Sequence, residues 1–218
     1  MLACAGLLWL AQAVLADRAS ELIAFASIKP GDKVADFMPD GGYFTRLFCK
    51  VVGDAGHVYV IGVPQLAAPS ASEVAGACHN VTTSNLKSRL VPAPELHDDS
   101  DPGYVYEYWS SSPAAENFTA PEPLDVIWIS ENYHDLHSKA FGSPDMSRVN
   151  IALLSALKPG GLLLIEDHAV TVQQVRREVT QAGFEFVGEL HHSEDTRTAN
   201  AHDVHHKTAR FLLKFRKR

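Results

Sequence analysis

Short apolar segments alternate with amphipathic segments along most of the chain, and this alternation is the strongest constraint on the fold. Apolar runs bounded by Gly or Pro are typical of buried strands, whereas apolar residues that recur with the helical period are typical of helices. The expected strands are residues 33–38, 57–63, 125–130, 162–166, 184–190 and 211–215, with a weak strand at 80–83. The expected helices are residues 21–27, 43–52, 148–157 and 172–182.

The order of these segments predicts an α/β fold built on one mostly parallel sheet. Strands that alternate with helices are joined to parallel neighbours by helical crossovers. The last two expected strands, 184–190 and 211–215, have no helix of any length between them. We therefore expect these two strands to form an antiparallel pair at one edge of the sheet.

Two polar segments lie outside this alternation. Residues 98–123 are rich in Ser, Pro, Ala and Tyr and are expected to form a long loop, whose aromatic side chains either cover a pocket or pin the loop to the surface. Residues 191–206 contain several histidines, and His202, His205 and His206 could collect a transition metal. A solvated, His-rich loop fits the polar composition better, so we predict no metal site.

Composition excludes several classes of protein. The chain has 218 residues, of which 46% are apolar and 21% are charged, a balance typical of a globular domain. Its formal net charge of −7 offers no basic field, so no nucleic-acid partner is expected. Three cysteines are too few for a disulfide-rich scaffold or a four-cysteine zinc site. No run of about 20 apolar residues is present, so no membrane-spanning helix is expected.

Residues 1–16 form an uncharged, largely apolar segment before the expected single domain at 17–218. The segment resembles the hydrophobic part of a secretory signal, although no Lys or Arg precedes it. An apolar helix packed on the domain and a misassigned start are the alternatives. We expect a periplasmic or secreted protein if the signal is real and a cytoplasmic one otherwise. Cys49 and Cys78 could pair in an oxidising compartment, but both also fit buried free thiols.

The segment that follows the first expected strand contains a glycine-rich turn. It reads Pro39-Asp40-Gly41-Gly42-Tyr43 and leads directly into an expected helix. In open α/β sheets such strand–turn–helix units bind nucleotides, because glycines let the backbone approach the ligand and the amides at the helix start face it. The segment matches neither the GxGxxG fingerprint nor the GxxxxGK[ST] phosphate loop. It therefore fits either a nucleotide site or a plain tight turn.

Five segments resemble a family of class I S-adenosylmethionine-dependent methyltransferases, many of them exported. They are IKPGDKVADFMPDGGYFTRLF, VGDAGHVYVIGVP, DVIWISENYHDLH, LKPGGLLLIEDHA and KTARFLLKFRK, and the resemblance covers residues 17–218. It implies a Rossmann-like fold with a mostly parallel seven-stranded sheet whose last strand is antiparallel. It also implies S-adenosylmethionine as the cofactor, bound above the carboxyl ends of the first two strands, and a small-molecule or unidentified methyl acceptor.

Carried over residue by residue, the resemblance implies three groups of site residues. The cofactor would be bound by Asp36, Asp40, Gly41, Gly42, Tyr43, Gln65 and Asn132. The catalytic residues would follow the strand at 125–130 and would be Tyr133, His134 and Asp135. The methyl acceptor would contact Asp167 and His168, after the strand at 162–166.

His134 is the candidate general base, because the ordinary pKa of histidine, about 6.5, leaves a neutral fraction at pH 7. A loop histidine that bonds the backbone is an equal alternative. Asp135 is adjacent to His134 in the chain, and adjacency alone does not make it the group that orients the ring. Tyr133 either stacks on the acceptor or the adenine, or packs in the core. Asp167 and His168 either line the acceptor site or simply end a strand.

Three departures from the family pattern keep a second function open. Asp40 replaces a family glycine, and the strand at 57–63 is followed by Pro64-Gln65 without the acid that often binds the ribose. After Asp167 the chain enters a helix almost at once, where the family has a longer loop. We predict a methyltransferase in which proximity and orientation do most of the catalysis. A non-enzymatic binding module with the same fold is the alternative.

Overall fold

The computed structural model describes residues 19–39, 41–70, 73, 80–92, 96–97, 105–106, 109–192 and 210–218. Several expectations fall on other residues: the segment 1–16, Asp40, Cys78, His202, His205 and His206. These expectations, and with them the question of export, stay predictions. Within the described ranges, no helix is long and apolar enough to cross a bilayer.

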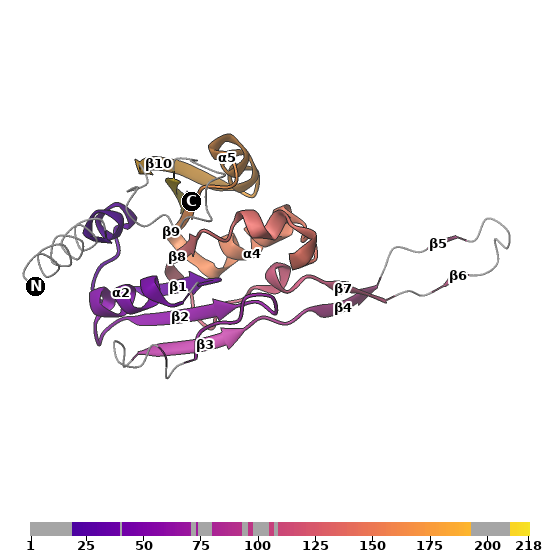
Figure 1. The fold of residues 1–218 in the computed structure, drawn as a ribbon, viewed down its shortest axis with the longest axis horizontal. Helices are drawn as coiled ribbons and strands as arrows, with labels where there is room; N and C mark the ends of the chain where they lie inside the picture. Colours follow the sequence, from indigo (N-terminus) through magenta and orange to yellow (C-terminus); the bar gives the residue numbers. More distant parts are fainter. Residues whose placement is uncertain are drawn as a thin grey trace, which may run out of the picture.

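A seven-stranded sheet forms the centre of the molecule, in the order β10-β11-β9-β8-β1-β2-β3 (Figure 1). All strands of this sheet run parallel except β11, which is antiparallel to both β9 and β10. The strands are β1 Lys33–Phe37, β2 His57–Gly62, β3 Val81–Asn85, β8 Leu124–Ser130, β9 Leu157–Asp167, β10 Phe184–His192 and β11 Arg210–Lys217. The α/β fold, the mostly parallel sheet and the antiparallel last strand are confirmed.

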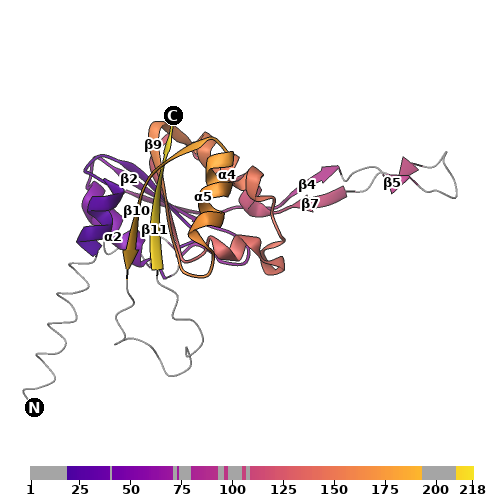
Figure 2. The same cartoon turned by 90° about the horizontal axis from the view of Figure 1, so that it is seen from above.

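Helices cover both faces of the sheet (Figure 2). The helical residues 19–26 and α2 (Tyr43–Val52) pack on one face. On the other face lie α4 (Met146–Ala156) and α5 (Val172–Gln181). Three short turns of 3-10 helix complete the described helical structure: η1 Ala114–Asn117, η2 His134–His137 and η3 Lys139–Phe141. Of these, η2 directly follows the end of β8 and carries the candidate base.

The alternation of side chains along the strands divides the core into two apolar clusters, one on each face. In β8, Ile129 belongs to the cluster under α4 and α5, whereas Trp128 belongs to the cluster under α2. Trp128 packs against Phe44 and Phe48 of α2, with ring centroids 4.8 and 5.5 Å away. The same alternation continues to the strand ends, where it decides which polar side chains lie on which face.

A two-stranded ribbon projects from the body of the molecule (Figures 1 and 2). In it, β4 (Arg89–Pro92) pairs antiparallel with β7 (Trp109–Ser112), and β5 (Leu96–His97) pairs with β6 (Val105–Tyr106). The expectation of a plain loop at 98–123 is therefore wrong in its described part, which contains β6, β7 and η1. These strands are too short to show an alternating pattern, so the sequence does not reveal their pairing.

Cys49 of α2 is buried and disulfide-bonded. The alternative of a free thiol at Cys49 is therefore wrong. The other cysteines of the chain, Cys4 and Cys78, lie outside the described residues, so the pairing with Cys78 stays a prediction.

We expect Leu153→Ala to lower the free energy of unfolding by about 2–5 kcal/mol, because it leaves a cavity between α4 and the sheet. Leu153 is completely buried, whereas Ile151 on the same helix is 49% exposed. The matched variant Ile151→Ala should lower it by less than about 1 kcal/mol. Urea denaturation measures both, and equal losses would contradict this packing of α4.

Candidate functional site

Three neighbouring strands, β1, β8 and β9, end side by side at the carboxyl edge of the sheet. Because side chains alternate along a strand, Asp36, Ser130 and Glu166 lie on the face covered by α2. Each follows, by two positions, a member of the apolar cluster on that face: Val34, Trp128 and Leu164. Asp167 is one position beyond Glu166 and lies on the opposite face, towards α4 and α5. The edge therefore carries polar side chains on both faces: Asp36, Ser130 and Glu166 on the α2 face, and Asp167 on the opposite face.

A pocket of about 240 Å³ opens on the α2 face of this edge. It is lined by Ala19, Leu22, Asp36, Pro39, Tyr43, Phe44, Ser130, Glu131, Glu166 and Arg210. Within the lining, Ser130 Oγ donates a hydrogen bond to Glu166 Oε2 (2.7 Å), and Arg210 forms an ion pair with Glu131. The pocket thus combines apolar and aromatic walls with carboxylates and a guanidinium group.

The turn between β1 and α2 leaves the start of the helix open. Gly41 and Gly42 have φ angles of 57° and 69°, which glycine adopts without a steric penalty. Gly42 is the N-cap residue and supplies no side-chain acceptor for the amides of the first turn, which contains no acidic residue. A Cβ atom added to Gly41 would meet no atom within 4 Å. The first turn of α2 thus has no side-chain cap from Gly42 and lies next to the pocket that Tyr43 lines, while Arg46 Nη1 donates a hydrogen bond to the carbonyl oxygen of Gly41 (3.0 Å).

Asp36, the penultimate residue of β1, is a buried carboxyl group on the wall of this pocket. Its Oδ2 accepts a hydrogen bond of 2.5 Å from Thr45 Oγ1 in α2. Burial raises the pKa of Asp36 to about 7, although the hydrogen bonds from Thr45 act in the opposite direction. Near neutral pH this group therefore exists in both charge states, and a cation bound beside it would favour the ionised state.

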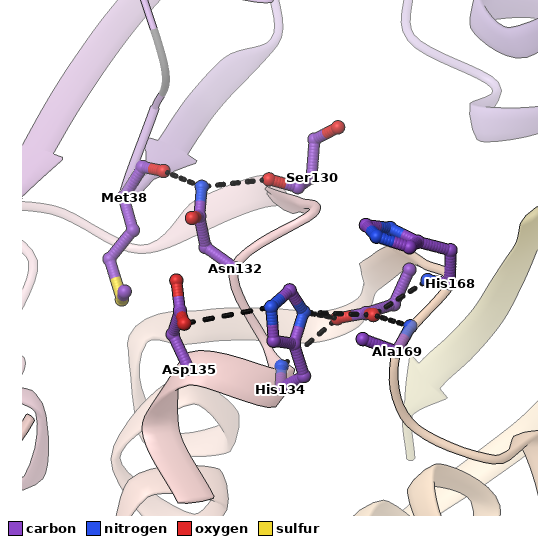
Figure 3. Close-up of polar contacts among 8 residues, drawn as sticks. Met38, Ser130, Asn132, His134, Asp135, His168 and Ala169 are labelled. Atoms are coloured by element: carbon purple, nitrogen blue, oxygen red, sulfur yellow. Dashed lines mark hydrogen bonds and ion pairs between the residues drawn. The ribbon is translucent and has the colours of Figure 1, made fainter. Parts of the chain in front are cut away.

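Asn132 joins the ends of β1 and β8 (Figure 3). Its Nδ2 donates hydrogen bonds to the carbonyl oxygens of Met38 (2.7 Å) and Ser130 (2.9 Å). Met38 and Glu131 have φ angles of 58° and 59°, a strained conformation for residues with a side chain. Asn132 therefore holds two strained strand ends together. It has no amide hydrogen left for the cofactor contact that the resemblance implies.

His134 and Asp167 form a hydrogen-bonded dyad on the other face of the sheet. His134 Nδ1 lies 3.0 Å from Asp167 Oδ1, and the amide of His134 donates to Asp167 Oδ2 (3.0 Å). The buried carboxylate of Asp167 also accepts hydrogen bonds from the amides of His168 (2.6 Å) and Ala169 (2.8 Å). Asp135 Oδ1 is 3.5 Å from Nε2 on the other side of the ring. A carboxylate fixed against Nδ1 orients the ring, and in the neutral tautomer with its proton on Nδ1 the unprotonated nitrogen is Nε2.

Asp167 therefore has a role that the sequence does not reveal. Its contacts are with His134 and with backbone amides, so it orients the candidate base rather than binding an acceptor. The ring of His168 lies edge-on to that of His134, with centroids 5.5 Å apart. The buried Nδ1 of His168 has no hydrogen-bond partner among the described residues, and its contact with an acceptor stays a prediction.

Tyr133 is a core residue, so the expectation that it stacks on an acceptor or on the adenine is wrong. Its side chain is completely buried in the cluster under α4 and α5. Its hydroxyl accepts a hydrogen bond from Asn150 Nδ2 in α4 (3.0 Å) and donates one to Glu178 Oε2 in α5 (3.1 Å). Burial raises the pKa of Tyr133, so the hydroxyl stays neutral and cannot act as a base.

Gln65 does not reach the pocket. It is exposed in a tight turn between Val63 and Leu66, whose backbones pair with each other. At Gly62, the last residue of β2, a Cβ atom would lie 2.1 Å from the amide nitrogen of Ala68. The chain after β2 therefore folds closely over the strand end, and its residues 63–70 include no acid.

Several pocket residues were not predicted from the sequence. Glu166 ends a run of apolar residues, and a buried acid at such a position is rare enough to have indicated a site. Glu131 and Arg210 give no local signal, because β11 brings them together from distant parts of the chain. In the part of the chain that the structure describes, no group of three or more His, Cys, Asp or Glu side chains is placed to hold a metal ion.

Comparison with solved structures identifies the fold. The sequence matches no protein-family model and no curated protein. The structure is similar to that of a SAM-dependent methyltransferase from Aquifex aeolicus, with a TM-score of 0.57, 15% identity and coverage of 92% of this chain and 89% of that one. This chain has the Rossmann-like methyltransferase fold. It is also similar to the N-methyltransferase NodS from Bradyrhizobium japonicum WM9 in complex with S-adenosyl-l-homocysteine, with a TM-score of 0.56, 13% identity and coverage of 92% and 86%.

The methyltransferase fold alone does not decide the chemistry. The [4+2]-cyclase SpnF is similar to this chain with a TM-score of 0.59 and 17% identity, over 93% of this chain and 80% of that one. Likeness at such low identity shows the fold, and a fold can host unrelated activities. The activity of this protein must therefore be argued from the residues at its carboxyl edge.

A hydrogen-bonded pair behind the dyad makes stability depend on pH. The hydrogen bond to Glu178, 2.9 Å from His137 Nε2, raises the pKa of His137 above its ordinary 6.5. Burial acts to raise the pKa of Glu178, but the hydrogen bonds from His137 and Gln174 outweigh it and bring the pKa below 4.5. The raised histidine pKa stabilises the fold at low pH, and this contribution is lost as the pH rises through the raised value. The lowered carboxyl pKa contributes at higher pH and is lost on acidification.

We expect His137→Gln to cost most stability at about pH 5.5–6, where His137 is charged and Glu178 is ionised. The difference from the wild type should shrink as the pH rises through the raised pKa of His137, since His137 then loses its proton. Urea denaturation at a series of pH values measures this difference. His191→Gln, at an exposed histidine 3.4 Å from Glu189, is the matched control. A difference that does not change with pH would contradict the assignment.

Proposed function

We propose that this protein is an S-adenosylmethionine-dependent methyltransferase that acts on a hydroxyl group of a small-molecule or still unidentified acceptor. The observation that carries the proposal is the bond from the buried carboxylate of Asp167 to Nδ1 of His134, at the same sheet edge as the pocket. A hydroxyl nucleophile needs a base that removes its proton, and an oriented imidazole is the commonest such group. The methyltransferase fold raises the prior for this chemistry by analogy.

The residues on the α2 face fit the amino-acid end of the cofactor, which carries a carboxylate, an ammonium and a sulfonium group. The helix amides that follow Gly42 suit the carboxylate. The carboxyl groups of Asp36 and Glu166 and the aromatic ring of Tyr43 suit the two positive charges. The pocket volume of about 240 Å³ is below the ~300–1,000 Å³ of typical ligand sites. The pocket therefore accommodates this end of the cofactor rather than the whole molecule.

On the opposite face, His134 and Asp167 manage the proton of the acceptor. The cofactor, when bound, supplies an electrophilic methyl group on its sulfonium. Asp167 accepts the hydrogen on Nδ1 of His134, so that Nε2 is unprotonated and can take the proton of the acceptor hydroxyl. The carboxylates of Asp167 and Asp135 then stabilise the imidazolium that results, at 3.0 Å from Nδ1 and 3.5 Å from Nε2.

The position of the acceptor follows from the two faces. The pocket and the dyad lie on opposite faces of one edge, and the proposal therefore has the acceptor across the ends of β8 and β9. Asn132 keeps the ends of β1 and β8 at a fixed distance, and the separation between the pocket and the dyad is fixed with them. Fixed placement of the two reactants is worth more than the base itself, since orientation can remove about 7–11 kcal/mol of a barrier.

A second candidate function is a binding module that keeps the fold without catalysis. The observation that favours it is the end of β2, where Gln65 is exposed and no acid is present. Such an end provides no carboxylate for the ribose hydroxyls of a nucleoside. Calorimetry separates the two functions, because a protein that shows no heat and no thermal shift with millimolar S-adenosylmethionine would be the module.

Gly41→Leu should weaken the binding of S-adenosylmethionine at least about tenfold, because the new side chain enters the space beside the α2 amides. The positive φ at Gly41 also adds about 1–2 kcal/mol of backbone strain. Gly31→Leu is the matched control, since Gly31 has a φ of 88° and an equally open Cβ position but precedes β1 at the other edge. Both variants should lose similar melting temperature, and only the first should lose affinity in calorimetry. Equal affinities would contradict the cofactor site.

His134→Gln should slow methyl transfer by about 10²–10⁴-fold while the affinity for S-adenosylmethionine changes less than about twofold. Asp167→Asn should have the same pattern, because the ring loses its orienting carboxylate. Release of S-adenosylhomocysteine with a panel of small hydroxyl compounds measures turnover, and calorimetry measures the affinity. His191→Gln is the control. Wild-type turnover in His134→Gln would show that His134 is not the base and would leave the cofactor site standing.

A further inference from the structure

A second group of hydrogen-bonded side chains lies on the same face of the sheet as His134 and Asp167, under α4 and α5. Neither the pocket nor the proposed proton transfer uses this group. It is centred on the carboxylate of Glu178 in α5. Oε2 of Glu178 accepts hydrogen bonds from the hydroxyl of Tyr133 (3.1 Å) and from Nε2 of His137 (2.9 Å). Oε1 accepts a hydrogen bond from Nε2 of Gln174 (3.0 Å). One carboxylate thus contacts three side chains from two separate parts of the chain.

The two distant partners of Glu178 flank the candidate base. Tyr133 directly precedes His134, and His137 ends the short turn η2 that His134 begins. Their rings meet edge to face, with centroids 5.5 Å apart at an interplanar angle of 63°. Asn150 of α4 donates a further hydrogen bond of 3.0 Å to the hydroxyl of Tyr133. Glu178 therefore holds both sides of the turn that carries His134.

Glu178 is itself held in a fixed relation to Asp167. The chain passes from Asp167 to the N-cap residue of α5, Thr171, through only residues 168–170. Thr171 Oγ1 accepts a hydrogen bond from the amide of Gln174 (3.2 Å), and Gln174 lies one helical turn before Glu178 and bonds it. Asp167 and Glu178 thus belong to one short, well-anchored stretch. From it they contact the same turn at two points.

We propose that Glu178 is a positioning residue for His134. Through its hydrogen bonds with Tyr133 and His137, Glu178 fixes the turn η2, so that the imidazole ring of His134 keeps its hydrogen bond to Asp167. The catalytic meaning of this role rests on the proposed function. The positioning itself is a property of the protein without cofactor or acceptor, and it can be measured there. The link of residues 168–170 between β9 and α5 is short, so Asp167 and Glu178 contact this turn from neighbouring parts of the chain.

Glu178→Gln tests the proposal, because it keeps the size of the side chain and removes its charge and one acceptor oxygen. In the wild-type protein, NMR of histidines labelled with nitrogen-15 should show one His134 tautomer, protonated at Nδ1. The backbone amides of residues 134–137 should be protected from hydrogen exchange. In Glu178→Gln we expect exchange at these amides to be at least about tenfold faster and the His134 ring signals to shift or broaden.

Two further variants make the test specific. Glu189→Gln, at an exposed glutamate that contacts His191 on β10, should leave the exchange rates and the His134 signals as in the wild type. Should Glu178→Gln fail to fold, His137→Gln removes the other member of the pair and is measured in the same way. Once an acceptor is known, Glu178→Gln should lower kcat and leave the KM for the cofactor unchanged.

Wild-type exchange rates and ring signals in a folded Glu178→Gln variant, or in His137→Gln if Glu178→Gln does not fold, would overturn the proposal. A uniform rise of exchange over α5 and the whole sheet would also overturn it, because that pattern indicates general loss of stability rather than release of one turn. Neither readout needs cofactor or acceptor. A protein that fails to bind S-adenosylmethionine would therefore refute the proposed function and still decide whether Glu178 positions His134.

Discussion

The alternation of side chains along β9 is the constraint on which the site depends. Glu166 and Asp167 are adjacent in the chain, yet they lie on opposite faces of the sheet. One contributes to an acidic pocket that suits a cation, and the other orients an imidazole. A single peptide step therefore separates the side chain that lines the pocket from the side chain that orients His134. The same alternation places Trp128 under α2 and Ile129 under α4, so the core and the site follow one rule.

Backbone strain at the strand ends is the cost of this arrangement. Met38 and Glu131 both have left-handed φ angles, which cost of order 1–3 kcal/mol each for residues that carry side chains. Such conformations persist only where the surroundings hold them. Asn132 does so from between the two strand ends, with hydrogen bonds of 2.7 and 2.9 Å. The side chain that the family resemblance assigns to the cofactor thus stabilises the shape of the edge itself.

The fold could be predicted from the sequence to a large extent, but the partnerships within the site could not. The bounds of α2 follow from the glycines on either side, and the structure has them at Tyr43–Val52 as expected. His134 is a candidate from the sequence, but its contact with Asp167 could not be predicted, because Asp167 lies 33 residues away and meets it only through the parallel pairing of β8 and β9. The prediction for Tyr133 is wrong, because the sequence pattern of an aromatic residue after a strand is the same whether the side chain packs in the core or lines a pocket. Glu178 has the pattern of a solvated helix residue, so nothing local marked it.

The short link between β9 and α5 has a consequence for how this protein can change. Residues 168–170 form a short connection that keeps α5 close to the end of β9. An inserted residue would lengthen this connection, and α5 could then move relative to the end of β9 without any substitution at His134 or Asp167.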